Sequence, residues 1–324
     1  MTAILLLILI GVDLGSAFSG FFRGMFGNIY QISEVLVKTT PLLLAGLGCS
    51  IGFQCGFINL GAEGQLYMGA LASSVVAIFL GHLPHLLLIP LMMVCGFLAG
   101  GLWALIPGVM KAKFGLSEVI MSLMFNYIAI QFIALAIRTW LKDPEYPFPM
   151  SQPFTESAQL PRLVPRTRLH IGFIIAIVLA ALVYIFLWKT ARGFQIRACG
   201  CNPRASFCVG VNVNLNIILS SLLSGGLAGF AGFVEVSGVQ HKLMDGISSN
   251  YGYLAVMVSL LGSNHPLGVA IAALLLGALD IGGLSMQRSA GVPTSLTTVI
   301  LGMIVIVFLL RHHFGKKEKE ISHE

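Results

Sequence analysis

Long stretches of apolar residues, separated by short polar and glycine-bearing segments, recur along this 324-residue chain. A helix needs roughly 20 predominantly apolar residues to cross a membrane, and several of these stretches approach that length. The stretches are continuous, whereas a transmembrane β-barrel would show strands of about 10 alternating residues. The pattern predicts an all-α, polytopic transmembrane bundle. The expected segments are about 37–53, 66–80, 86–110, 118–140, 171–188, 215–236, 251–261, 267–284 and 292–310, after a short apolar start at 1–10.

The chain is thus expected to have about nine to ten segments, and some of them should be broken or half helices. Pro41 interrupts the segment at 37–53 early, and 251–261 is too short to span alone. Residues 18–30 carry several phenylalanines around Arg23, which is typical of a membrane interface. A glycine-to-histidine turn between two apolar segments occurs twice, at 81–85 and 262–265. Such a duplication points to the inverted repeats that many transporters contain.

The polar segments are too short for a separate soluble domain, so residues 1–324 are expected to form one transmembrane domain. The loop 142–170 carries six prolines and is therefore neither helix nor central strand. We expect this loop outside the cell, and the basic loop 189–213 and the charged tail 311–324 in the cytoplasm. The preference for Lys and Arg on the cytoplasmic side favours this orientation only weakly, because Arg138 and Arg162 then lie outside.

Composition and motifs exclude several functions. Only 10% of the residues are charged, against roughly 25% in soluble domains, and 56% are hydrophobic. The net charge of +6 is spread over loops and the C-terminus, so no nucleic acid polymer is expected as a partner. The six cysteines lack CxxC spacing and predict no metal site. No phosphate-binding loop, HExxH or GxSxG motif occurs, so we expect neither an enzyme nor a bound cofactor.

The stretch 52–70, GFQCGFINLGAEGQLYMGA, places three polar residues between two apolar segments. A carboxylate at membrane depth is costly, which makes Glu63 a candidate functional residue. If 56–68 is helical, Asn59 and Glu63 lie on one helical face. The glycines allow a second interpretation, in which they serve only close helix packing. Asn59, Glu63 and Gln65 are therefore candidate functional residues of this stretch.

Glu235 could be a structural acid that bonds to neighbouring backbone. For Glu118 we favour a structural role, in which it anchors the start of its helix near Lys113.

The basic loop 189–213 contains a helix start of its own. Asn202 precedes Pro203, and proline is favoured at the first position of a helix. Residues 204–209 then form a short amphipathic helix ahead of Gly210. Such a helix in a cytoplasmic loop suits docking onto another protein, although a basic anchor without a partner fits the composition equally well.

Several motifs in colinear order make the chain resemble the permease subunits of bacterial ABC importers for nucleosides and simple sugars, relatives of the ribose and branched-chain amino-acid permeases. The resemblance covers about residues 35–310. Its motifs are GFINLGAEGQLYMGALAS, FGLSEVIMSLMFNYIA, GFQIRACGCNPRASFCVGVNV, GGLAGFAGFVEVSGVQ and NYGYLAVMVSLLGSNHPLG. The loop departs from the family pattern at 198–201, where an acidic residue usually precedes Asn-Pro. The short segment at 1–10 is a second departure.

The resemblance implies a multi-pass protein of the bacterial inner membrane that moves a nucleoside or simple sugar. The residues expected at or near its substrate pathway are Asn59, Glu63, Gln65, Asn126 and Glu235. It further implies an extracellular binding protein, ATP-using subunits in the cytoplasm, and a second permease as a heterodimer partner. Contact with the ATPase would be made by Gly200, Asn202, Pro203, Arg204 and Ala205.

Two other classes stay open from the residues alone. In an ion-coupled carrier, Glu63, Glu235 and Asp280 would be ion sites. The chain could also be a membrane-embedded enzyme or a structural subunit.

Overall fold

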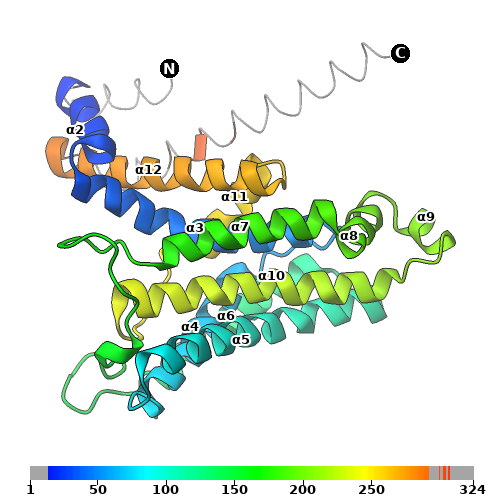
Figure 1. Ribbon diagram of the computed structural model, residues 1–324, viewed down its shortest axis with the longest axis horizontal. Helices are drawn as coiled ribbons and strands as arrows, with labels where there is room; N and C mark the ends of the chain where they lie inside the picture. The colour runs from blue at the N-terminus through cyan, green and yellow to red at the C-terminus, as the bar shows by residue number, and fades with distance from the viewer. Residues whose placement is uncertain (1–13, 292–298, 300–301, 304–305, 307–324) are drawn as a thin grey trace. The chain divides into compact units, whose positions relative to one another are not determined.

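The computed structural model describes residues 14–291, 299, 302–303 and 306 (Figure 1). The predicted segments at 1–10 and 311–324, and nearly all of 292–310, lie outside these residues. Within the described part every named element is a helix, and β-structure is limited to isolated bridges. The elements are α2 (Leu14–Phe26), α3 (Ile29–Gln54), α4 (Ala62–Phe79), α5 (His85–Phe114), α6 (Glu118–Ala136), η1 (Glu156–Ala158), α7 (Gly172–Lys189), α8 (Ala191–Cys201), α9 (Pro203–Cys208), α10 (Val213–Glu235), η2 (Val236–Gln240), α11 (Tyr251–Leu261) and α12 (Pro266–Ala290).

Seven of the described helices are long and apolar enough to cross a membrane, which confirms the predicted polytopic helical bundle. α11 has 11 residues and stands as a separate short helix, as predicted. The prediction for α3 was wrong at its start, because the helix begins at Ile29 and continues through Pro41. A proline inside a membrane helix is tolerated where neighbouring helices and side chains satisfy the freed backbone groups.

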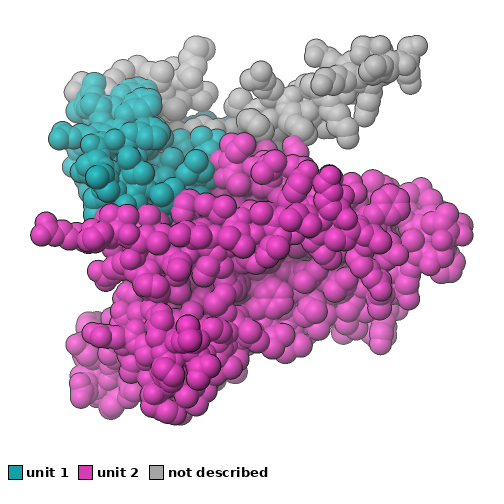
Figure 2. Space-filling model, in the orientation of Figure 1, with its two compact units in different colours: residues 1–39, 274–324 teal, residues 40–273 magenta. Residues whose placement is uncertain are grey.

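The described chain divides into two compact units, which are coloured separately in Figure 2. One unit comprises residues 1–39 and 274–324, and the other comprises residues 40–273. The larger unit is built around α4, α5 and α10, and Figure 1 shows α5 and α10 running side by side.

Glycines bring the three central helices into backbone contact. A Cβ added to Gly69 of α4 would lie 2.2 Å from the carbonyl oxygen of Gly229 in α10. A Cβ on Gly229 would in turn lie 2.3 Å from the carbonyl oxygen of Gly96 in α5. Small residues at such positions are how membrane helices approach closely without a hydrophobic driving force between them.

The proline-rich loop between α6 and α7 is irregular, as predicted, apart from the single 3-10 turn η1. It is attached to the segment that follows α10. Ser151 donates its backbone N–H to the Leu243 carbonyl at 2.8 Å, and the Leu243 N–H donates to the Ser151 hydroxyl at 2.9 Å. The sequence did not predict η2, a π-helical turn that continues α10.

Candidate functional site

Residues 55–61, which join α3 to α4, are not helical, so the condition under which Asn59 and Glu63 would share one helical face is not met. The chain turns because Gly56 adopts a φ of +75°, a left-handed conformation that glycine reaches without strain. The Phe57 N–H then returns to the Gly52 carbonyl at 2.9 Å. Asn59 therefore lies in the connecting segment, whereas Glu63 lies in the first turn of α4.

Asn59 forms a closed hydrogen-bond network. Its Nδ2 donates to Gln65 Oε1 and to Ser224 Oγ, both at 2.8 Å. Its Oδ1 accepts from the Gly61 N–H and from Gln65 Nε2, both at 2.9 Å. Asn59 and Gln65 are buried, so full pairing removes the cost of burying two amides. The network ties the connecting segment to α4 and, through Ser224, to α10.

Glu63 lies where the first turns of two helices meet. Its Oε2 accepts the Gly252 N–H at 2.7 Å, and the Ser248 side chain and the Tyr253 backbone lie near this carboxylate. Gly252 packs so closely that a Cβ there would lie 2.1 Å from the Glu63 nitrogen. Helix N-termini stabilise negative charge. The first turns of α4 and α11 therefore offset the cost of burying this carboxylate.

Asn126 connects α6 to the start of α4. Its Oδ1 accepts the Gly64 N–H at 2.8 Å, and its Nδ2 donates to the Leu60 carbonyl at 2.8 Å and to the Tyr253 hydroxyl at 3.4 Å. We call the group of Asn59, Glu63, Gln65 and Asn126 the α4 junction.

Glu235 is a separate buried acid. It is the last residue of α10, where its Oε1 accepts from Gln240 Nε2 at 3.3 Å. The five predicted pathway residues are at most 3% exposed within the chain. The hydrogen bonds of the junction hold α4, α6, α10 and α11 together, and a solute could reach them only if these helices moved apart.

We call residues 189–213 the docking loop, after the role expected of them, and they contain two short helices. α9 begins with Pro203 at its first position, and Asn202 caps it by accepting the Ala205 N–H at 3.1 Å, as predicted. The sequence did not predict α8, which Thr190 caps through the Gly193 N–H. Arg204 and Ala205 are exposed.

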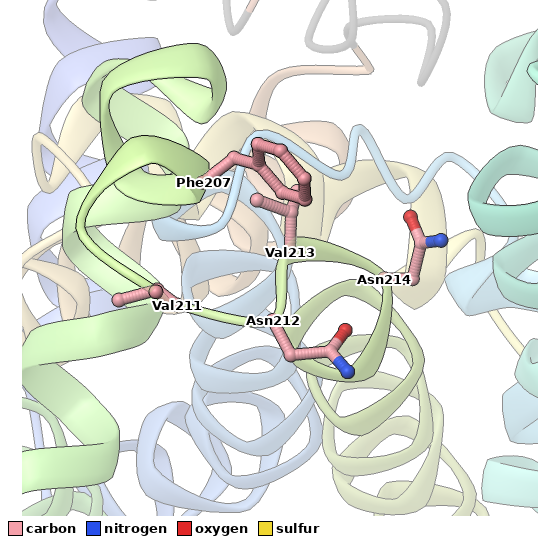
Figure 3. A pocket seen from close by; sticks show the side chains of 6 residues that line it. Phe207, Val211, Asn212, Val213 and Asn214 are labelled. Atoms are coloured by element: carbon pink, nitrogen blue, oxygen red, sulfur yellow. The ribbon is translucent and has the colours of Figure 1, made fainter.

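The tip of this loop also exposes two large apolar side chains: Phe207 is 74% exposed and Val209 is 78% exposed. Beside them lies a hollow of about 580 Å³. Figure 3 shows the side chains of residues that line this hollow: Phe207, Val211, Asn212, Val213 and Asn214. Neighbouring exposed apolar side chains with polar residues around them are typical of a protein-binding surface.

Gly200 faces inward and not toward the tip. A Cβ on Gly200 would lie 2.1 Å from the Gln54 carbonyl oxygen and 3.1 Å from the Gly56 nitrogen. α8 therefore rests directly on the backbone at the end of α3, in contact with the segment that leads to the α4 junction.

Lys111, near the end of α5, bonds to the segment 55–61 that joins α3 to α4. Its Nζ donates to the Gly56 carbonyl and to Glu118 Oε1, the latter at 2.6 Å. Glu118 Oε1 also accepts the Ile58 N–H at 3.3 Å. The expectation that Glu118 anchors its helix near Lys113 was therefore wrong in its partner, which is Lys111. Both lysines lie close to Glu118 in the sequence, and nothing in the sequence indicates which of them is its partner.

Three relatives match most of the chain. A guanosine ABC transporter permease protein of Bacillus subtilis is 34% identical over 98% of this chain and 92% of its own length. A glucose ABC transporter permease protein of Haloferax volcanii is 32% identical over 96% and 84%. A second guanosine ABC transporter permease protein of Bacillus subtilis is 27% identical over 77% and 82%. The family model described as branched-chain amino acid transport system / permease component matches residues 31–309.

Proposed function

Because the chain belongs to the branched-chain amino acid transport system / permease component family, we propose that it is the membrane-spanning permease subunit of an ABC importer for nucleosides or simple sugars. The observation that carries this proposal is the match of nearly the whole chain to permeases for guanosine and glucose. Both solutes present several hydroxyl groups, and guanosine adds a base. A pathway for either needs hydrogen-bonding groups in an otherwise apolar bundle.

ATP is used by separate ATPase subunits that contact the docking loop from the cytoplasm. The exposed Phe207 and Val209 supply apolar contact area, and Arg204 supplies charge beside them. The α8 contact with Gln54 and Gly56 gives movement of this loop a direct route to the segment that precedes α4. This chain accordingly hydrolyses no ATP and binds no cofactor itself.

A second permease completes the pathway, and a binding protein outside the membrane delivers the solute. The presence of two guanosine permease relatives in Bacillus subtilis supports a heterodimer of two different chains. The assembly lies in the bacterial inner membrane, with the docking loop in the cytoplasm and residues 142–170 outside.

The α4 junction holds the pathway helices in place, and Glu235 lies at the end of α10, one of these helices. The hydrogen bonds of the junction connect α4, α6, α10 and α11, so a change in helix spacing must break or rearrange them. The five residues thus lie next to the pathway. They need not contact the solute in the conformation described.

Reconstitution into vesicles tests the proposed function. The chain is combined with its ATPase, the second permease and the binding protein, and uptake of labelled guanosine and glucose is measured. Uptake of one of them should require ATP and persist with an uncoupler, while the isolated chain should hydrolyse no ATP. Uptake that continues without ATP and stops with an uncoupler would identify an ion-coupled carrier instead.

A further inference from the structure

An ion pair joins α3 and α12 within the smaller compact unit. Lys38 Nζ lies 3.5 Å from Asp280 Oδ2. Both residues belong to helices that are long and apolar enough to cross a membrane. Lys38 is about 5 Å from the midpoint of α3 along the helix axis, and Asp280 is about 3 Å from the midpoint of α12. The pair therefore lies far from the ends of both helices.

The two side chains remain accessible from outside the chain. Their exposed fractions are 21% for Lys38 and 35% for Asp280, whereas the predicted pathway residues are at most 3% exposed. A charge near the middle of a membrane helix is costly in lipid, and such residues face a bundle interior or a water-filled cavity. The accessible side of this pair is therefore expected to meet water or another polar group.

Asp280 also points away from the apolar exposed face of its own helix. Leu274 and Leu275 are 45% and 42% exposed on α12. At about 100° per residue, Asp280 is rotated by about 120° from Leu274 and about 140° from Leu275. A helix with apolar residues on one exposed side and a charge on another is suited to lipid on the first side and a polar passage on the second.

Close helix packing fixes the pair. A Cβ on Gly277, one turn before Asp280, would lie 2.7 Å from Thr39 Oγ1 and 3.2 Å from the Thr39 nitrogen. Thr39 follows Lys38 directly, and its hydroxyl is held by the Val35 carbonyl at 2.7 Å. Because α3 and α12 pack this closely beside the pair, the positions of the two charged groups are fixed. A binding site requires such fixed positions.

We propose that Lys38 and Asp280 form a solute-binding point in the translocation pathway, where they hydrogen-bond the hydroxyl or base groups of a nucleoside or sugar. The inference rests on the proposed function and names the residues that contact the solute. An ammonium supplies donors and a carboxylate supplies acceptors, so together they match a hydroxyl, which does both. A paired site also keeps the bundle free of an isolated charge when no solute is bound.

Chemical labelling tests the proposal in the assembled transporter in vesicles. Asp280→Cys and the control Leu274→Cys are introduced into a chain with Cys95, Cys201 and Cys208 replaced by Ser. A charged, membrane-impermeant thiol reagent should label the cysteine at 280 and leave the one at 274 unlabelled, and guanosine or glucose should slow the labelling at 280. Equal labelling at both positions, or none at 280, overturns the proposal. This result does not depend on measuring transport, so it separates failure of the inference from failure of the proposed function.

The second measurement is solute uptake by a variant in which the two charges are exchanged. Lys38→Asp combined with Asp280→Lys retains an ion pair but inverts its direction. This variant should reach the membrane at the unmodified level and yet take up solute at least about tenfold more slowly, the effect of one lost hydrogen bond to a charged group. Uptake at the unmodified rate would mean that the pair only stabilises the fold. Loss of the second permease on purification would mean that the pair is a subunit contact, and would overturn the proposal.

Discussion

The Glu63 carboxylate accepts the backbone N–H of Gly252 at 2.7 Å, across 189 positions of sequence. The bond joins the first turn of α4 to the first turn of α11, the short helix that cannot span a membrane alone. A short buried helix leaves its first N–H groups without intrahelical partners. Glu63 therefore satisfies a group that α11 cannot satisfy itself, and its position determines where α11 begins.

Replacement of Glu63 by Gln should loosen α11. The amide keeps one acceptor oxygen for the Gly252 N–H, but it removes the negative charge and buries an NH2 donor in place of the second oxygen. We expect a loss of about 1–3 kcal/mol, the cost of leaving a buried donor unsatisfied. Thermal unfolding in detergent measures this loss, and uptake at matched membrane levels should fall with it.

Glu156→Gln is the matched control, because Glu156 is an exposed acid in the loop between α6 and α7. An unfolding midpoint for Glu63→Gln that equals the control would show that Glu63 does not anchor α11. The same result together with lowered uptake would make Glu63 a residue that acts on the solute directly.

Local signals in the sequence predicted some of the local structure of this chain. Asn202 and Pro203 indicated the start of α9 because the cap and the first helical position involve adjacent residues. The partners of the polar residues were not predictable in the same way. Ser224 meets Asn59 across 165 positions, and only the folded arrangement of α4 and α10 brings them together. The sequence therefore singled out Asn59 and Glu63 as unusual without showing that they hold helices.

Lys111 and Lys113 provide a direct comparison of two basic residues in one helical turn. Lys111 bonds the Gly56 carbonyl and Glu118, while Lys113 makes no hydrogen bond or ion pair with any residue that the structure describes. Lys111→Ala should cost about 1 kcal/mol, less than the roughly 1.5–3 kcal/mol of hydrogen bonds to charged groups, because the site is partly exposed. Lys113→Ala should leave the unfolding midpoint unchanged.

The exchange Lys111→Glu with Glu118→Lys distinguishes the ion pair from the backbone bond. It restores opposite charges but places a carboxylate against the Gly56 carbonyl, which offers no proton. We therefore expect no recovery of stability or uptake. Recovery of both would show that the ion pair alone matters and that the contact with Gly56 contributes little.

His170 makes the stability of the loop before α7 depend on pH. Burial, and then the nearby His241, lower the pKa of His170 from 6.5 to about 4. Since the exposed imidazole of the unfolded loop binds a proton more readily, stability should fall as pH falls from 6.5 to 4, by about 2 kcal/mol at pH 5. The unfolding midpoint measured between pH 7 and 5 should fall accordingly.

His170→Phe keeps a ring in the space beside Gly238 and removes the titrating group. Its unfolding midpoint should vary less with pH than that of the unmodified chain. His241 also has a pKa lowered by burial, so some dependence should remain. An unchanged slope for His170→Phe would assign the pH dependence to groups other than His170.

Two variants of the docking loop should distinguish its contact with the ATPase from its contact with the rest of the chain. Phe207→Asp places a charge on the exposed apolar tip, and should lower ATPase co-purification at least about tenfold, as loss of an interface anchor does. Gly200→Ala instead adds a Cβ 2.1 Å from the Gln54 carbonyl oxygen, so α8 must shift from the end of α3. This variant should retain the ATPase, which then hydrolyses ATP with reduced solute uptake. If Gly200→Ala lost the ATPase and Phe207→Asp retained it, the partner would bind the inner side of α8, and the exposed tip would have another role.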